Sequence, residues 1–166
     1  MKNIQENSDV IVGKFGGNEA LKDVSAIKRL PLIVDKEMTA QQCNIIVVSA
    51  IGQTTRKLDE VFQLYEMQQF NEAIEMLEKI LREHEETCWE LFSEEDNSAV
   101  DLIRKSIRST AEYIRNNFPL YEERDRAKSK ILSVGEVMSW HTVSSYLTHS
   151  GIKNLKLDSS EVLRTL

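Results

Sequence analysis

The feature that most constrains the fold of this chain is its long middle stretch, residues 57–128, which contains no glycine. Glycine favours turns and helix ends, so a stretch of this length without one favours continuous helices. The stretch carries 10 basic and 18 acidic side chains, whereas the rest of the chain carries 11 and 9. This contrast predicts a long, acidic helical insertion between two pieces of a different kind.

Apolar residues inside the stretch recur at intervals of three and four, as one face of a helix requires. The first stripe contains Leu58, Val61 and Tyr65. A longer stripe covers residues 70–92, and a third follows a possible helix cap at residues 97–98. Two asparagines and a proline interrupt the pattern at residues 116–119. Three successive helices are therefore predicted.

The pieces on either side of the stretch contain strand signals. Residues 10–15 are rich in β-branched side chains and end at a Gly-Gly turn, which predicts a short buried strand. Residues 44–49 hold four consecutive β-branched aliphatics, as is typical of a parallel strand buried on both faces. Residues 152–157 alternate apolar and polar side chains and predict a third strand.

Helical spacing fills the remaining segments. It covers residues 21–34, where Pro31 is expected to kink the helix, and residues 131–147, which end before Gly151. The resulting order of strand, helix, strand, helical insertion, helix and strand predicts an α/β fold with a parallel sheet flanked by helices. Three strands leave open sheet edges, so we expect a larger natural domain or self-association into a homo-oligomer.

Charge and composition exclude several functions. The 166 residues have a net charge of −6, which argues against a general nucleic-acid binder. No apolar run approaches the roughly 20 residues that span a bilayer, and no signal peptide is evident. Cys43 and Cys88 lack metal or redox spacing, as do the three histidines. We therefore expect a cytoplasmic protein without a nucleic-acid, membrane or metal partner.

The first segment that could carry chemistry is Lys14-Phe15-Gly16-Gly17, directly after a predicted strand. Glycines at a strand end let backbone N–H groups approach a phosphate, and a lysine can stabilise a phosphoryl group in transfer. The same residues also fit a plain tight turn with a lysine in solvent.

Two further segments carry polar side chains suited to a small substrate. Ser49 and Thr55 follow the second predicted strand, and ligands of open α/β sheets bind outside the carboxyl ends of strands. Their hydroxyls could bind a substrate or could cap the next helix. Glu136 lies near the predicted start of the last helix, where the helix dipole stabilises a carboxylate that could accept an ammonium group. An ordinary first-turn glutamate is the alternative.

In this order the segments resemble those of aspartate kinases, members of the amino acid kinase family. Val12-Gly-Lys-Phe-Gly-Gly17 resembles the Lys-Phe-Gly-Gly that opens those enzymes. Residues 47–58 look like their Val-Ser-Ala-Met-Gly-Gly-Val-Thr-Asn-x-Leu segment, and residues 133–139 look like their Ser-x-Gly-Glu-x-x-Ser segment. Residues 151–165 are similar to the family's Gly-Ile…Leu-Asp-Ala-Arg…Ile-x-Thr stretch. The long helical block argues against the acetylglutamate, glutamate and uridylate kinases, whose equivalent region is shorter.

The resemblance implies a three-layer, amino acid kinase-like fold that transfers the γ-phosphoryl group of ATP, with Mg²⁺, to the β-carboxylate of L-aspartate. This reaction opens the biosynthesis of lysine, threonine and methionine. The implied roles are stabilisation of the phosphoryl group by Lys14 and a phosphate-approaching turn at Gly16 and Gly17. Phosphoryl transfer depends mostly on such positioning and charge neutralisation.

For the substrate, the resemblance implies that Ser49, Thr55 and Glu136 bind L-aspartate, with Glu136 facing the amino group. The sequence departs from the family at Asn18-Glu19, where Thr-Ser is usual, and at Gln53 and Arg56. A glutamate beside a phosphate site weakens anion binding through like charge.

The family's Gly-Gly-Ser-Asp segment, nucleotide-binding loops and regulatory ACT domains have no counterpart in residues 1–166. We therefore interpret the chain as the N-terminal, aspartate-binding part of an amino acid kinase domain, with a helical insertion at about 57–128. On its own it is expected to be inactive and to retain neither ATP nor Mg²⁺. A non-catalytic relative that binds an amino acid or a partner subunit, and an assembly role for the acidic helices, stay open.

Overall fold

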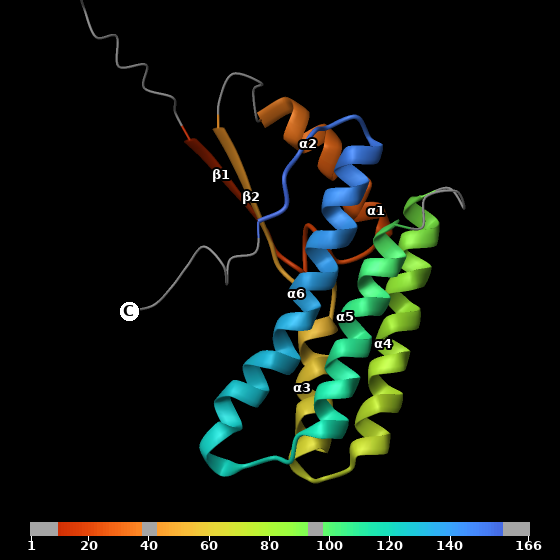
Figure 1. Cartoon of the computed structure of the whole chain (residues 1–166). Coiled ribbons are helices and arrows are strands. Elements are labelled where there is room, and N and C mark those ends of the chain that lie inside the picture. The colour runs from red at the N-terminus through yellow and green to blue at the C-terminus, as the bar shows by residue number, and fades with distance from the viewer. Residues whose placement is uncertain (1–9, 38–42, 93–97, 158–166) are drawn as a thin grey trace, which may run out of the picture.

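The computed structural model describes residues 10–37, 43–92 and 98–157, and it shows a small parallel sheet at one end of a bundle of long helices. Figure 1 shows the sheet and two short helices at the upper end, with the bundle extending below them. The described part is therefore mostly helical. It is compatible with an α/β fold, while the three-layer arrangement stays a prediction.

The sheet consists of β1 (Val10–Phe15) and β2 (Cys43–Val48), paired in parallel along their whole length. Both strands were expected from the sequence and are confirmed, but the expected burial of β1 is wrong, because Val10 and Val12 are 53% and 61% exposed. The expected burial of the second strand on both faces is wrong, because Ile45 and Val47 are 42% and 45% exposed. Helices cover only the opposite face of the sheet, to which Phe15 and Val48 contribute.

The connection between the strands forms two short helices, α1 (Val24–Ile27) and α2 (Leu30–Glu37). Asp23 caps α1 by accepting a hydrogen bond from the N–H of Ala26 at 2.8 Å. Pro31 lies in the first turn of α2, where its missing N–H costs no intrahelical bond. The expected single helix kinked at Pro31 is therefore wrong, since the break comes before the proline.

Four helices form the bundle: α3 (Thr54–Glu66), α4 (Phe70–Leu91), α5 (Ser98–Asn116) and α6 (Arg124–His149). A 3₁₀ turn, η1 (Tyr121–Glu123), leads into α6. The helices run alternately away from and toward the sheet, each packs on the next in sequence, and α6 closes the ring against α3. The predicted helical block is confirmed, but it starts at Thr54 and continues into α6 without a separating domain boundary.

A single hydrophobic core joins the bundle to the sheet end. Its largest fully buried side chains come from both parts of the described chain and include Leu21, Ile27, Leu58, Phe62, Tyr65, Leu77, Ile103, Ile131 and Met138. The two parts are therefore one packed unit. No helix within the described residues is long and apolar enough to cross a membrane.

The predicted third strand is wrong, because residues 152–157 form no strand in the structure. The chain leaves α6 at Gly151, which has a φ of +86°. Asn154 then ties the segment back to α6, since its side-chain amide donates to the Ser144 carbonyl at 3.2 Å and to Thr148 Oγ1 at 3.0 Å. Alternation alone did not predict this local contact with the helix end. Residues 158–166, which include the rest of the family-like segment 151–165, lie outside the described residues.

A buried histidine joins α4 to the start of α3. His84 is 3% exposed, its Nδ1 donates to the Ile80 carbonyl at 2.9 Å, and its Nε2 lies 3.4 Å from Thr54 Oγ1. Because a carbonyl can only accept, Nδ1 carries the proton of the neutral ring. Burial lowers the pKa of His84, as it lowers the pKa of His141 to about 4. Both rings are therefore neutral at pH 7.

We predict that stability falls as the pH drops below about 6.5, the ordinary pKa of histidine. The unfolded chain then binds protons at His84 and His141 that the folded chain binds only at lower pH, so stability present at neutral pH is lost. Each site adds at most about 1.4 kcal/mol per pH unit to the slope. Urea unfolding of wild type and His84→Gln between pH 7 and 5 measures how steeply the free energy of unfolding changes with pH. The variant should have the shallower slope, the exposed control His149→Gln should match wild type, and equal slopes for all three would contradict the prediction.

Candidate functional site

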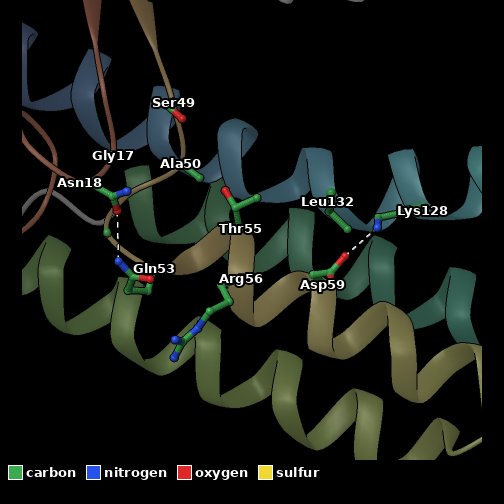
Figure 2. Close-up of a pocket in the computed structure, with 11 residues that line it drawn as sticks. Gly17, Asn18, Ser49, Ala50, Gln53, Thr55, Arg56, Asp59, Lys128 and Leu132 are labelled. Atoms are coloured by element: carbon green, nitrogen blue, oxygen red, sulfur yellow. Dashed lines mark hydrogen bonds and ion pairs between the residues drawn. The ribbon is translucent and has the colours of Figure 1, made fainter.

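A hollow of about 430 Å³ lies at the carboxyl ends of β1 and β2, where the sheet meets the bundle. The turn after β1 contributes Gly17 and Asn18, residues 49–59 contribute most of the wall, and α6 contributes Lys128 and Leu132. Figure 2 shows these residues along the first turns of α3 and the facing side of α6. The position matches the general rule that open parallel sheets bind ligands beyond the carboxyl ends of their strands.

Two glycines bring the walls of the hollow together at Ala50, which is buried. A methyl group built onto Gly17 would lie 2.1 Å from the carbonyl oxygen of Ala50. One built onto Gly135 would lie 3.1 Å from the Ala50 Cβ and 2.9 Å from Leu58 Cδ1. Both positions therefore exclude larger residues. The turn after β1, the segment after β2 and α6 meet at this one alanine.

The start of α3 is fixed by the residues that precede it. Gly52 has a φ of +54°, a left-handed conformation that glycine adopts most easily, and its N–H donates to the Leu21 carbonyl at 3.0 Å. Thr54 Oγ1 donates to the Ile51 carbonyl at 2.6 Å. Gln53 donates to Asn18 Oδ1 at 3.1 Å and so links the two turns across the hollow (Figure 2). The N-terminal turn of α3 is thereby held at the hollow.

Three of the predicted site residues lie together in this hollow, namely Gly17, Ser49 and Thr55. Gly16 is adjacent, and its carbonyl accepts hydrogen bonds that close the turn after β1. Lys14 lies outside the lining, exposed on β1 opposite Val47 in the strand register. The structure therefore brings the two strand-end segments together, as predicted, with the lysine beside them on the open face of the sheet.

Glu136 is not near the start of a helix, and that prediction is wrong. It lies in the middle of α6, which begins at Arg124, so the helix dipole gives its carboxylate no terminal stabilisation. Its side chain is exposed and does not line the hollow. Glu136 lies one helical turn from Leu132 and two turns from Lys128, so the three residues share one face of α6.

Three charged residues of the hollow escaped prediction as ligand-binding groups: Arg56, Asp59 and Lys128. Lys128 Nζ lies 2.8 Å from Asp59 Oδ1, joining α6 to α3. The hydrogen bond from Lys128 lowers the pKa of Asp59 below its usual value, so the Asp59 carboxylate is ionised at neutral pH. The two residues are far apart in sequence, and only the bundle topology brings them together.

The hollow offers groups that suit a small anion or zwitterion. The first turn of a helix such as α3 presents N–H groups without intrahelical acceptors and the positive end of its dipole. The hydroxyls of Ser49 and Thr55 add polar groups that can donate or accept. No group of three or more metal-ligating side chains occurs among the described residues.

No known family model matches this sequence, and no curated protein matches it either.

We predict opposite effects for alanine at the two adjacent glycines. Gly17→Ala should lower the free energy of unfolding by about 2 to 3 kcal/mol, because its methyl group overlaps the Ala50 carbonyl, which is backbone and cannot rotate away. Gly16→Ala should be neutral or stabilise by up to about 1 kcal/mol, because no atom lies within 4 Å of its added methyl group. Urea unfolding of both variants checks the pair. Equal stability for the two would contradict the close approach at Gly17.

Proposed function

We propose that this chain binds L-aspartate in the hollow and is the substrate-binding part of an aspartate kinase. The observation that carries the proposal is the convergence at Ala50 of the three segments that resemble that family. These segments are far apart in sequence. The first two line the hollow at the carboxyl ends of two parallel strands, and the third packs against them through Gly135. A chance set of separate turns and helix starts has no reason to converge in this way.

The hollow offers groups of both signs to an amino acid. The first turn of α3, with Thr55, presents N–H groups and a hydroxyl to a carboxylate. Glu136 is exposed one turn beyond Leu132 on α6, outside the lining of the hollow, and is the carboxylate to which we assign the ligand's ammonium group. The ligand's charge pattern is thus matched by residues from two helices.

Phosphoryl transfer is the step that we assign to the turn after β1. ATP with Mg²⁺ is the phosphoryl donor in the family that the sequence resembles. In this proposal the N–H groups at Gly16 and Gly17 bind a phosphate, and Lys14, exposed on β1, supplies a positive charge. Residue alternation places Lys14 and Ser49 on one face, since Lys14 pairs with Val47, two residues before Ser49.

Binding is tested by the melting temperature of the protein with millimolar L-aspartate. A ligand that binds only the folded state stabilises it by about 2.7 kcal/mol at a hundredfold excess over its Kd. We expect a clear rise for L-aspartate and none for D-aspartate or succinate, which lacks the ammonium group. The absence of a shift at any concentration would remove the basis for a substrate site.

Substitutions test which groups bind. Glu136→Gln and Ser49→Ala should each weaken L-aspartate at least about tenfold by calorimetry, because each removes a hydrogen bond to a charged ligand group. Ser129→Ala, an exposed serine on α6 outside the lining, is the matched control and should bind as wild type does. Equal affinities in all three variants would place the ligand elsewhere.

Catalysis is tested on the gene product isolated from its own cells, whose intact mass is determined first. With ATP, Mg²⁺ and L-aspartate, hydroxylamine should trap an acyl phosphate, and Lys14→Met should lower its formation at least about a hundredfold. Binding without any trapped product would instead favour the non-catalytic, amino-acid-binding relative.

A further inference from the structure

Two ion pairs connect α3 to α6, and only one of them lines the hollow. Arg124 forms a two-point contact with Glu66, Nε to Oε1 at 2.5 Å and Nη2 to Oε2 at 3.0 Å, toward the end of the bundle far from the sheet. Lys128 pairs with Asp59 through a single contact at 2.8 Å inside the hollow (Figure 2). The two-point pair is the better structural link, so the pair in the hollow is available for another role.

Lys128 is held loosely enough for a ligand to take it over. Both partners of the pair are partly exposed, and exposed ion pairs contribute little net stability because water screens them. The ammonium group also lies 5.5 Å from the centre of the Phe62 ring, which attracts a cation and holds it at the wall of the hollow. A carboxylate entering the hollow therefore competes with Asp59 for Lys128.

Lys128 lines the hollow one helical turn from Leu132, which lines it too. Glu136 lies a further turn along α6, about 12 Å along the axis from Lys128, and outside the lining. The long, flexible stem of Lys128 lets its ammonium group reach a ligand carboxylate over Leu132.

We propose that Lys128 binds the α-carboxylate of the amino acid in the hollow. Without ligand, Asp59 holds the ammonium group of Lys128 in place, and the ligand's α-carboxylate then displaces Asp59 from Lys128. This proposal rests on the proposed function and deepens it, because it makes Lys128 a specificity-determining residue. The ligand's β-carboxylate then remains at the glycine turn and Lys14. Asp59 is the internal competitor, so its removal should improve binding while removal of Lys128 should weaken it.

The test compares L-aspartate with its α-amide, L-isoasparagine, by calorimetry. Lys128→Gln should weaken L-aspartate at least about tenfold and change the α-amide by less than about twofold, because only the first carries the α-carboxylate. Asp59→Asn should tighten L-aspartate by about two- to fivefold, the range expected when an exposed competing pair is removed. The matched control Glu66→Gln breaks the other pair between the same helices and should leave both affinities unchanged.

The outcomes separate this proposal from the proposed function. Equal losses for both ligands in Lys128→Gln, or weaker L-aspartate binding in Asp59→Asn, would overturn the role of Lys128 while L-aspartate binding itself stands. If neither wild type nor Asp59→Asn binds L-aspartate, the proposed function fails and succinate becomes the probe. Tighter succinate binding in Asp59→Asn than in Lys128→Gln then supports Lys128 as the carboxylate-binding cation, and equal binding overturns it.

Discussion

The space around Ala50 is the constraint on which the rest of the structure depends. The carbonyl of this residue leaves no room for a Cβ on Gly17, and its methyl group would lie 3.1 Å from a Cβ on Gly135. These contacts join the turn after β1 to the segment after β2 and press α6 against the start of α3. Because overpacking a rigid contact is costly, the sheet end and the bundle have one relative position. The hollow lies where the sheet end meets the bundle.

The periodic elements could be predicted from the sequence, because strand and helix periods are local properties. Both strands and the helical block were found, with ends shifted by a few residues. Burial could not be predicted, because the β-branched run of β2 looks the same whether one face or both are covered. The error at residues 152–157 has a similar cause, since alternation did not show that Asn154 bonds back to α6.

Site residues next to a strand end were the easier ones to predict. Gly17 and Ser49 come together because parallel strands bring their carboxyl ends to one edge, which strand order alone implies. Lys128 and His84 are different, because they reach the hollow and the start of α3 only through the way the bundle closes. Glu136 was assigned to a helix start because the expected helix began at residue 131, whereas α6 begins at Arg124. Its neighbour Gly135 is a packing position inside α6.

The helices of the bundle and the small sheet beside the hollow differ in local stability. Each bundle helix packs on its neighbour in sequence and α6 also packs on α3, whereas β1 pairs with β2 alone among the described strands. The sheet has two strands and an open face, so it is the part with the least local stability. Far-ultraviolet circular dichroism reports mainly the helices and would barely change if the sheet end opened. Helical content is therefore a poor measure of whether a preparation still has its hollow, and exchange of the β2 amide protons is the sensitive one.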